Sequence, residues 1–133
     1  MFNNTKINIV FHDAGSSNFF LYWLKANNIK INRAYLKGPA IIIWKILFPK
    51  KKYFPQIDNK IVDCQKLIIG TGWQSDYEKK AMNIAYKNKI FFIAILDHWV
   101  NYKERFSYKK LILKPDELWT FDRYAFQLAK NIS

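Results

Sequence analysis

The hydrophobic residues of this 133-residue chain gather in four short runs in which apolar side chains follow one another almost without interruption. These runs cover residues 7–11, 66–70, 90–96 and 117–121. A strand with one face in water alternates apolar and polar residues, whereas a strand of a parallel sheet is buried on both faces and does not alternate. The runs therefore predict four parallel strands. Residues 29–36 do alternate, which predicts a fifth strand nearer the edge of the sheet.

Helical signals lie between and after the predicted strands. In residues 75–89, Ser75 and Glu78 have the spacing of a capping box, in which the Glu side chain binds the backbone at the start of the helix. One stripe of this segment carries Tyr77, Ala81, Ile84 and Ala85.

Three further helices are predicted at residues 16–28, 39–48 and 122–132. The segment PAIIIWKILF at 39–48 has the propensity of a strand as much as of a helix. We interpret it as a helix because Pro39 suits a helix start and because the alternation of strands and helices requires one there.

This alternation predicts the α/β fold class, with a five-stranded parallel sheet and helices on both of its faces. The expected strand order is 2-1-3-4-5, the flavodoxin-like order of a Rossmann-like domain. No internal repeat or linker interrupts the pattern, so residues 1–133 are expected to form a single domain. The basic, proline-bounded stretch at 49–60 is predicted to be a surface loop.

Polar turns follow four of the predicted strands. They read HDAGSSN at 12–18, GTGWQSD at 70–76, LDHWVNYKERF at 96–106, and Asp-Arg at 122–123. The strand-to-helix turns of a parallel sheet meet at its carboxyl edge, which is where open α/β proteins bind ligands. We therefore expect these turns to form one cleft.

Two of the turns have features of anion-binding loops. Gly70 and Gly72 predict a tight turn that leaves backbone N–H groups and a helix N-terminus facing an anion. In the alternative, the two glycines are needed only for the geometry and packing of the turn. The turn is not the dinucleotide-binding fingerprint, because Ser75 stands at the position of its third glycine. In the first turn, Gly15 allows the bend and Ser16 can cap a helix, while Asp13 has the alternative role of stabilising the turn itself.

The turn after residue 96 has residues suited to acid–base chemistry. Asp97 or His98 could deprotonate a hydroxyl group while Lys103 and Arg105 hold a phosphate. In the alternative, Asp97 caps the following turn and Arg105 pairs with Glu104 or Asp116.

Two acid–imidazole pairs occur, His12 with Asp13 and Asp97 with His98. Neighbours on a strand point to opposite faces, so at most one member of each pair is expected in the cleft unless the chain has already turned there. No third carboxylate or thiol stands at metal-ligand spacing, so neither a metal nor another cofactor is expected.

Trp73 and Trp99 lie in polar turns, where an aromatic ring suits a sugar or a nucleobase, with burial against a helix as the alternative. The predicted catalytic residues are Asp97, His98 and Asp13. The predicted ligand-binding residues are His12, Gly15, Ser16, Gly70, Thr71, Gly72, Trp73, Trp99, Asn101, Tyr102, Lys103, Arg105 and Asp122.

Composition narrows the classes of protein. Half of the residues are hydrophobic and 18% are aromatic, which excludes a disordered chain. The N-terminus has no secretory signal and Cys64 has no internal partner, so a cytoplasmic protein is expected. The net charge is +12, but lysine outnumbers arginine 19 to 3, and the bidentate contacts of nucleic-acid readers need arginine. Nucleic acid is therefore not the expected partner.

Residues 39–54 combine an almost wholly apolar helix with Lys50, Lys51 and Lys52. This combination suits attachment of the protein to the inner face of an anionic membrane. In the alternative, the helix lies between the sheet and a protein partner.

The sequences DAGSSN, Gly38-Pro39-Ala40, GTGWQSDYEKKA, LDHWVNYKERF and PDELWTFDRYAFQLA span nearly the whole chain. Together they resemble the N-terminal Rossmann-like domain of bacterial GT-B-type proteins of surface-polysaccharide synthesis, which include glycosyltransferases and UDP-N-acetylglucosamine 2-epimerases. In that superfamily the N-terminal domain faces the acceptor and a second Rossmann domain binds the nucleotide sugar.

The resemblance implies a glycosyltransferase-like domain acting in surface-polysaccharide or glycoconjugate biosynthesis on a nucleotide sugar and a sugar-containing acceptor. A protein partner or a second copy of the chain would complete its cleft. Two other functions stay open, namely a non-catalytic module that binds a nucleotide or sugar phosphate, and a basic domain that binds a membrane or nucleic acid.

Overall fold

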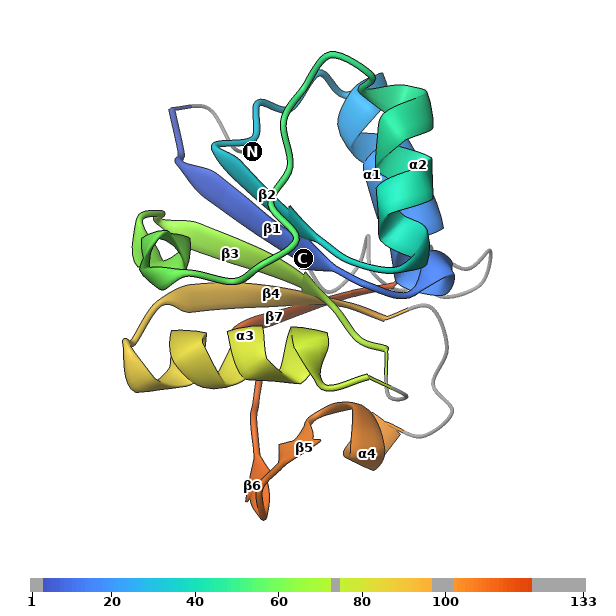
Figure 1. Cartoon of the computed structure of the whole chain (residues 1–133). Coiled ribbons are helices and arrows are strands. Elements are labelled where there is room, and N and C mark those ends of the chain that lie inside the picture. Colours follow the sequence, from blue (N-terminus) through green and yellow to red (C-terminus); the bar gives the residue numbers. More distant parts are fainter. Residues whose placement is uncertain (1–3, 73–74, 97–101, 121–133) are drawn as a thin grey trace.

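A computed structural model of the chain describes residues 4–72, 75–96 and 102–120 (Figure 1). Its main sheet is parallel throughout and has the strand order β2-β1-β3-β4-β7. The strands are β1 (Ile7–Phe11), β2 (Arg33–Leu36), β3 (Lys66–Gly70), β4 (Phe91–Leu96) and β7 (Glu117–Thr120). The predicted fold class and strand order are confirmed.

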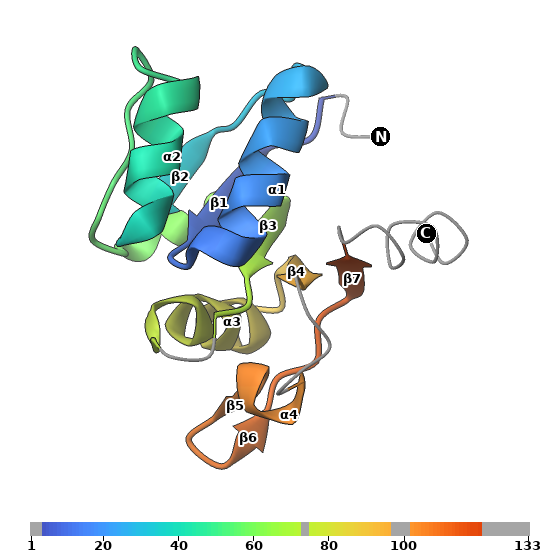
Figure 2. The same ribbon diagram turned by 90° about the vertical axis from the view of Figure 1, so that its right-hand side faces the viewer.

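Helices cover both faces of this sheet. The helices α1 (Ala14–Ala26) and α2 (Pro39–Leu47) lie side by side on one face, and α3 (Tyr77–Lys87) lies on the other (Figures 1 and 2). The predicted helix at 122–132 lies outside the described residues. None of the helices in the described ranges has the length and apolar character needed to cross a bilayer.

The alternation of side chains along the buried strands creates two cores. On β1, Ile9 and Phe11 pack with the residues of α1 and α2, whereas Val10 packs with those of α3. All five residues of β1 are buried. The sequence pattern of uninterrupted apolar runs therefore reflects burial on both faces.

The strand β2 is shorter than predicted. The pattern predicts a strand over residues 29–36, but pairing begins only where the Asn32 N–H donates to the Ile7 carbonyl, at 2.8 Å. The residue before Ile7 bonds on the other side, since the Lys6 carbonyl accepts from the Gln65 N–H at 2.8 Å. Ile29 and Ile31 still pack against the core, so their alternation reports burial without pairing.

The loop predicted at 49–60 covers the outer edge of β2. Phe54 forms an isolated bridge with Tyr35, its N–H donating to the Ala34 carbonyl at 2.8 Å. A short 3-10 helix, Asn59–Val62, ends this region. It is held by the fully buried Asn8 on β1, which donates to the Ile61 carbonyl at 2.9 Å.

The connection from β4 to β7 differs from the regular helix of the other crossovers. It contains the short helix α4 (Tyr102–Arg105) and a hairpin of β5 (Ser107–Tyr108) and β6 (Leu111–Ile112). Lys109 and Lys110 form the two-residue turn, both at positive φ. Such turns usually contain Asn or Gly, so this sequence gave no hairpin signal. The hairpin extends the α3 layer (Figure 1).

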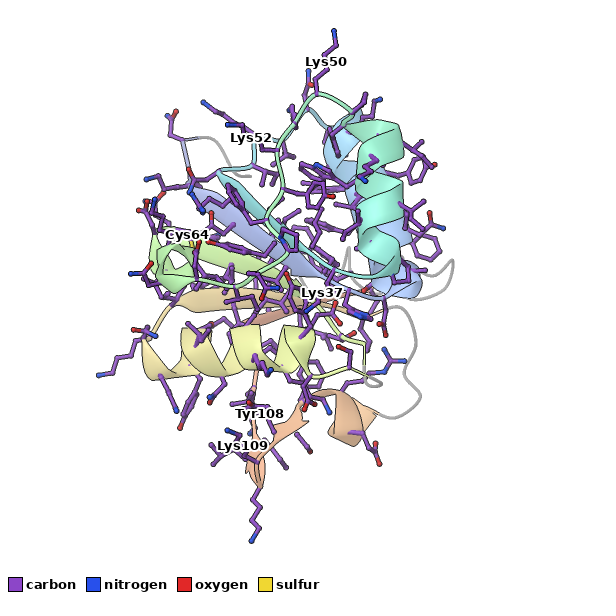
Figure 3. The ribbon with its side chains drawn as sticks, in the orientation of Figure 1. Lys37, Lys50, Lys52, Cys64, Tyr108 and Lys109 are labelled. Atoms are coloured by element: carbon purple, nitrogen blue, oxygen red, sulfur yellow. The ribbon has the colours of Figure 1, made fainter. Side chains whose placement is uncertain are left out.

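Cys64 should react slowly in the folded protein. It lies just before β3 (Figure 3), and its Sγ is 3.4 Å from the Ile61 carbonyl oxygen. Burial is the main cause that raises the pKa of this thiol to about 11, from an ordinary value of 9.0. Two pKa units lower the thiolate fraction roughly a hundredfold. We expect alkylation at pH 8 to be slow in buffer and fast in denaturant. Equal rates in both would contradict the described packing.

Candidate functional site

The carboxyl ends of β1 and β3 form the topological switch point of the sheet. The chain leaves β1 toward β2 on one side and leaves β3 toward β4 on the other. Ligands of open α/β sheets bind in the crevice between two such strands. Here that position is bordered by His12 and Asp13 after β1 and by Gly70, Thr71 and Gly72 at the end of β3.

A buried carboxylate bridges these two turns. Glu78, in the first turn of α3, is fully buried. One of its oxygens accepts from the Gly72 N–H at 2.7 Å and the other from the His12 N–H at 3.2 Å. A single side chain therefore ties the turn after β1 to the turn after β3.

This arrangement corrects the capping-box prediction. The N-cap of α3 is Asp76, and the Ser75 hydroxyl accepts from the Tyr77 N–H at 3.2 Å. Glu78 reaches across to another strand instead of bonding back to Ser75, because the fold brings two unpaired N–H groups close to its carboxylate. The Gly72 N–H, which the sequence suggested as a donor to a bound anion, already has this partner.

The two glycines make room for carboxylates. A Cβ atom at Gly70 would collide with Glu78 and lie 2.8 Å from Ser16 Oγ. A Cβ atom at Gly72 would collide with the carboxylate of Asp13. Both glycines are therefore required by close packing, which is one of the two roles that the sequence allowed.

His12 and Asp13 form a directly bonded pair. The distance between His12 Nδ1 and Asp13 Oδ1 is 2.6 Å, and the two side chains are 26% and 31% exposed. The chain has already turned out of β1 at His12, since α1 begins at Ala14. This is the case in which the opposite-face rule for strand neighbours does not apply, because the chain has already turned at this pair.

The His12 ring is held from other sides by Gly38 and Tyr77. Gly38 has φ +56, and a Cβ atom there would lie 3.0 Å from His12 Nε2. The Tyr77 ring centroid is 6.2 Å from that of His12. A positive φ is a conformation that favours glycine, so the Gly38-Pro39 pair both starts α2 and leaves space for the imidazole.

Tyr77 and Lys37 extend the site toward α2. The Tyr77 hydroxyl donates to the Pro55 carbonyl at 3.0 Å, and burial raises the pKa of this phenol well above its usual range. Lys37 Nζ lies 5.7 Å from the centre of the same ring. Figure 3 shows Lys37 between the start of α2 and α3. The sequence analysis did not select Gly38, Lys37, Tyr77 or Glu78 as site residues.

Arg105, at the end of α4, is hydrogen-bonded to the turn after β3. It is 5% exposed, and its Nη1 donates to the Thr71 carbonyl at 2.8 Å. The Thr71 hydroxyl in turn donates to the Ile95 carbonyl at 2.7 Å. These contacts give Arg105 a structural role that joins the α4 connection to the turn after β3.

The start of α1 lies at the same edge. Asp13 is its N-cap but makes no side-chain capping bond, and the Ser17 hydroxyl donates back to the Asp13 carbonyl. Gly15 and Ser16 belong to the first turn. Ser16 Oγ is buried and has no hydrogen-bond partner within the described part of the chain.

The structure thus brings together His12, Asp13, Gly70, Thr71 and Gly72, with Gly15 and Ser16 beside them. Tyr102 and Lys103 lie in α4. The remaining predicted site residues lie outside the described residues, namely Trp73, Asp97, His98, Trp99, Asn101 and Asp122.

Within the described ranges no group of three or more His, Cys, Asp or Glu side chains could hold a metal ion. Comparison of the chain with protein-family models, with curated proteins and with solved structures finds no match.

The contact between Gly72 and Asp13 predicts a strong coupling in stability. Gly72→Ala should destabilise the protein by about 1–3 kcal/mol, because the new methyl group displaces the Asp13 carboxylate. In an Asp13→Ala background the same change should cost much less, since the obstructing atoms are gone. Urea unfolding of the wild type, both single variants and the double variant measures this coupling. Additive effects would show that the two residues do not meet.

Proposed function

We propose that this chain is a glycosyltransferase-like domain of surface-polysaccharide or glycoconjugate biosynthesis, and that its carboxyl edge receives the hydroxyl-bearing acceptor. The observation that carries the proposal is the bonded pair of His12 and Asp13 at the switch point. The glycosyl chemistry itself is suggested by the turn sequences that resemble GT-B-type proteins.

The pair has the properties of a general base. A carboxylate that accepts the Nδ1–H of an imidazole fixes the tautomer in which Nε2 has a free lone pair, and it stabilises the imidazolium that forms later. No hydrogen-bond partner of Nε2 occurs among the described residues, and a quarter of the His12 side chain is exposed. The proposal requires that a ligand hydroxyl reach this atom, which lies beside Gly38.

The proposed reaction balances as follows. The acceptor hydroxyl oxygen attacks the anomeric carbon of the nucleotide sugar, and its proton moves to Nε2 of His12. The bond between the anomeric carbon and the diphosphate oxygen breaks, and the nucleoside diphosphate leaves with the electron pair. Asp13 stays ionised and orients His12 throughout.

The geometry favours an acceptor over a phosphate at this turn. The Gly72 and His12 N–H groups, which a phosphate would need, both donate to Glu78. A second anion placed beside that carboxylate would be repelled, in a region of low dielectric constant. The diphosphate of the donor is therefore assigned to a partner domain or chain, in agreement with the division of roles in GT-B-type proteins.

Turnover provides the test. The chain, purified together with the proteins that associate with it, is incubated with nucleotide sugars and with oligosaccharide or lipid-linked acceptors. Release of nucleoside diphosphate should depend on an acceptor. His12→Gln should lower kcat by roughly 10²- to 10⁴-fold with little change in KM. Asp13→Asn should lower kcat by a smaller factor.

Asp63→Asn is the matched control for Asp13→Asn, because Asp63 is an exposed carboxylate near the amino edge of the sheet. It should leave turnover unchanged. Wild-type turnover by His12→Gln would refute the role of the pair. Saturable binding of a nucleotide sugar without turnover in any mixture would replace the proposal with a non-catalytic binding module.

A further inference from the structure

The helices α1 and α2 expose large apolar side chains on the surface that faces away from the sheet. Ile42 and Ile46 on α2 are 64% and 66% exposed, and Phe19 and Tyr22 on α1 are 47% and 52% exposed. These four side chains define the α1/α2 face. They are spaced three or four residues apart, so each pair lies on one side of its helix.

These four side chains do not belong to the packed hydrophobic cores. The sheet-facing stripes of the two helices consist of other residues, among them Leu21 and Leu24 on α1 and Trp44 and Leu47 on α2. A helix at a protein surface usually presents polar residues opposite such a stripe. Here both neighbouring helices present apolar ones.

The same layer contains no acidic residue. All ten Asp and Glu residues of the chain lie outside positions 14–57, although that segment covers α1, β2, α2 and the loop after α2. It contains eight cationic residues, which are Lys25, Lys30, Arg33, Lys37, Lys45, Lys50, Lys51 and Lys52. The charged residues of this segment are therefore all cationic, and one of them, Arg33, is paired with Asp58 just beyond it at 3.4 Å.

Several of these cations gather where the two helices end. Lys25 Nζ donates to the Leu47 carbonyl at 3.0 Å, which joins the last turns of α1 and α2. Lys50, Lys51 and Lys52 follow α2 almost directly, and Lys50 extends away from that end of the molecule (Figure 3).

An open hollow of about 360 Å³ lies next to them. Its lining includes Lys30, Arg33, Lys51, Lys52, Trp44 and Phe48.

We propose that the α1/α2 face docks on an anionic lipid bilayer. The four apolar side chains enter the interfacial region, and the lysines at the helix ends bind lipid phosphates. Apolar residues surrounded by lysine are the composition of surfaces that lie in a membrane interface. A second copy of the chain fits less well, because two identical faces of this kind would bring like charges together.

This proposal goes beyond the function proposed above and does not depend on it. Both helices begin at the carboxyl edge of the sheet and end at the opposite edge, so the lysine-rich end is far from His12 along the helices. A docked domain would keep its switch point accessible to an acceptor at the membrane surface.

Flotation with vesicles tests the proposal. The wild type should float with vesicles that contain 30% phosphatidylglycerol in phosphatidylcholine at low salt, and should be released at high salt. Each lysine near an anionic surface contributes roughly a fivefold factor in partitioning. Lys50→Gln/Lys51→Gln/Lys52→Gln should therefore weaken binding roughly a hundredfold. Ile42→Glu/Ile46→Glu should also weaken binding to the vesicles, although this variant keeps all of its lysines.

Matched controls lie on α3 and at its C-terminal end, on the other face of the sheet. Lys80→Gln/Lys87→Gln/Lys89→Gln removes the same charge from exposed positions, and Tyr86→Glu replaces an exposed apolar side chain, so both should bind almost as well as the wild type. Circular dichroism verifies that each variant is folded.

Four results would overturn the proposal. Absence of binding to the anionic vesicles at low salt would exclude docking. Equal loss of vesicle binding in both triple-lysine variants would show that binding depends only on the net charge of the protein. A dimer that is detected by light scattering and disappears in Ile42→Glu/Ile46→Glu would assign the face to a second copy of the chain. An acidic protein that competes with the vesicles would assign the face to that protein.

Discussion

The hydrogen bonds of Glu78 are the constraint on which the rest of the site depends. A fully buried carboxylate accepts from the Gly72 N–H at the end of β3 and from the His12 N–H at the end of β1. An unpaired buried polar group costs about 1–3 kcal/mol. The Glu78 carboxylate and the two N–H groups avoid this loss by bonding to one another, at a place where the sheet itself offers them no partner. Gly70 leaves the space that the carboxylate fills. By fixing the backbone of His12, Glu78 also sets the position from which the imidazole reaches Asp13 and the surface.

The two functional proposals concern two different regions of the molecule, the carboxyl edge of the sheet and the outer surface of α1 and α2. At the carboxyl edge, an internal carboxylate takes the donors that would hold a phosphate, which leaves the bonded His12 and Asp13 as the groups able to act on a hydroxyl. Over α1 and α2, an apolar surface is accompanied only by cations. The sheet keeps these two regions at different places, since the site lies where the helices begin and the lysine-rich region lies where they end.

The sequence predicted the sheet well and the site only in part, for physical reasons. Continuous apolar runs mark strands buried on both faces, and all four of them became strands of the parallel sheet. Ile29 and Ile31 belong to the alternating pattern of residues 29–36 but lack a paired neighbour, which the pattern does not show because a local pattern reports burial and not pairing. The hairpin at Lys109 and Lys110 adopts positive φ without glycine or asparagine. Glu78 looked like a helix cap because spacing records only local partners, whereas its real partners lie on other segments of the chain.

Hydrogen exchange at two backbone amides tests the central claim most directly. In the wild type, the His12 and Gly72 amides should be protected although neither belongs to a strand. Glu78→Gln replaces one accepting oxygen by an NH₂ group, so at least one of these amides loses its acceptor, and its exchange should accelerate roughly tenfold or more relative to the core amide of Ile68. If both amides exchange in the variant as slowly as in the wild type, after correction by Ile68, then Glu78 does not hold the switch point together.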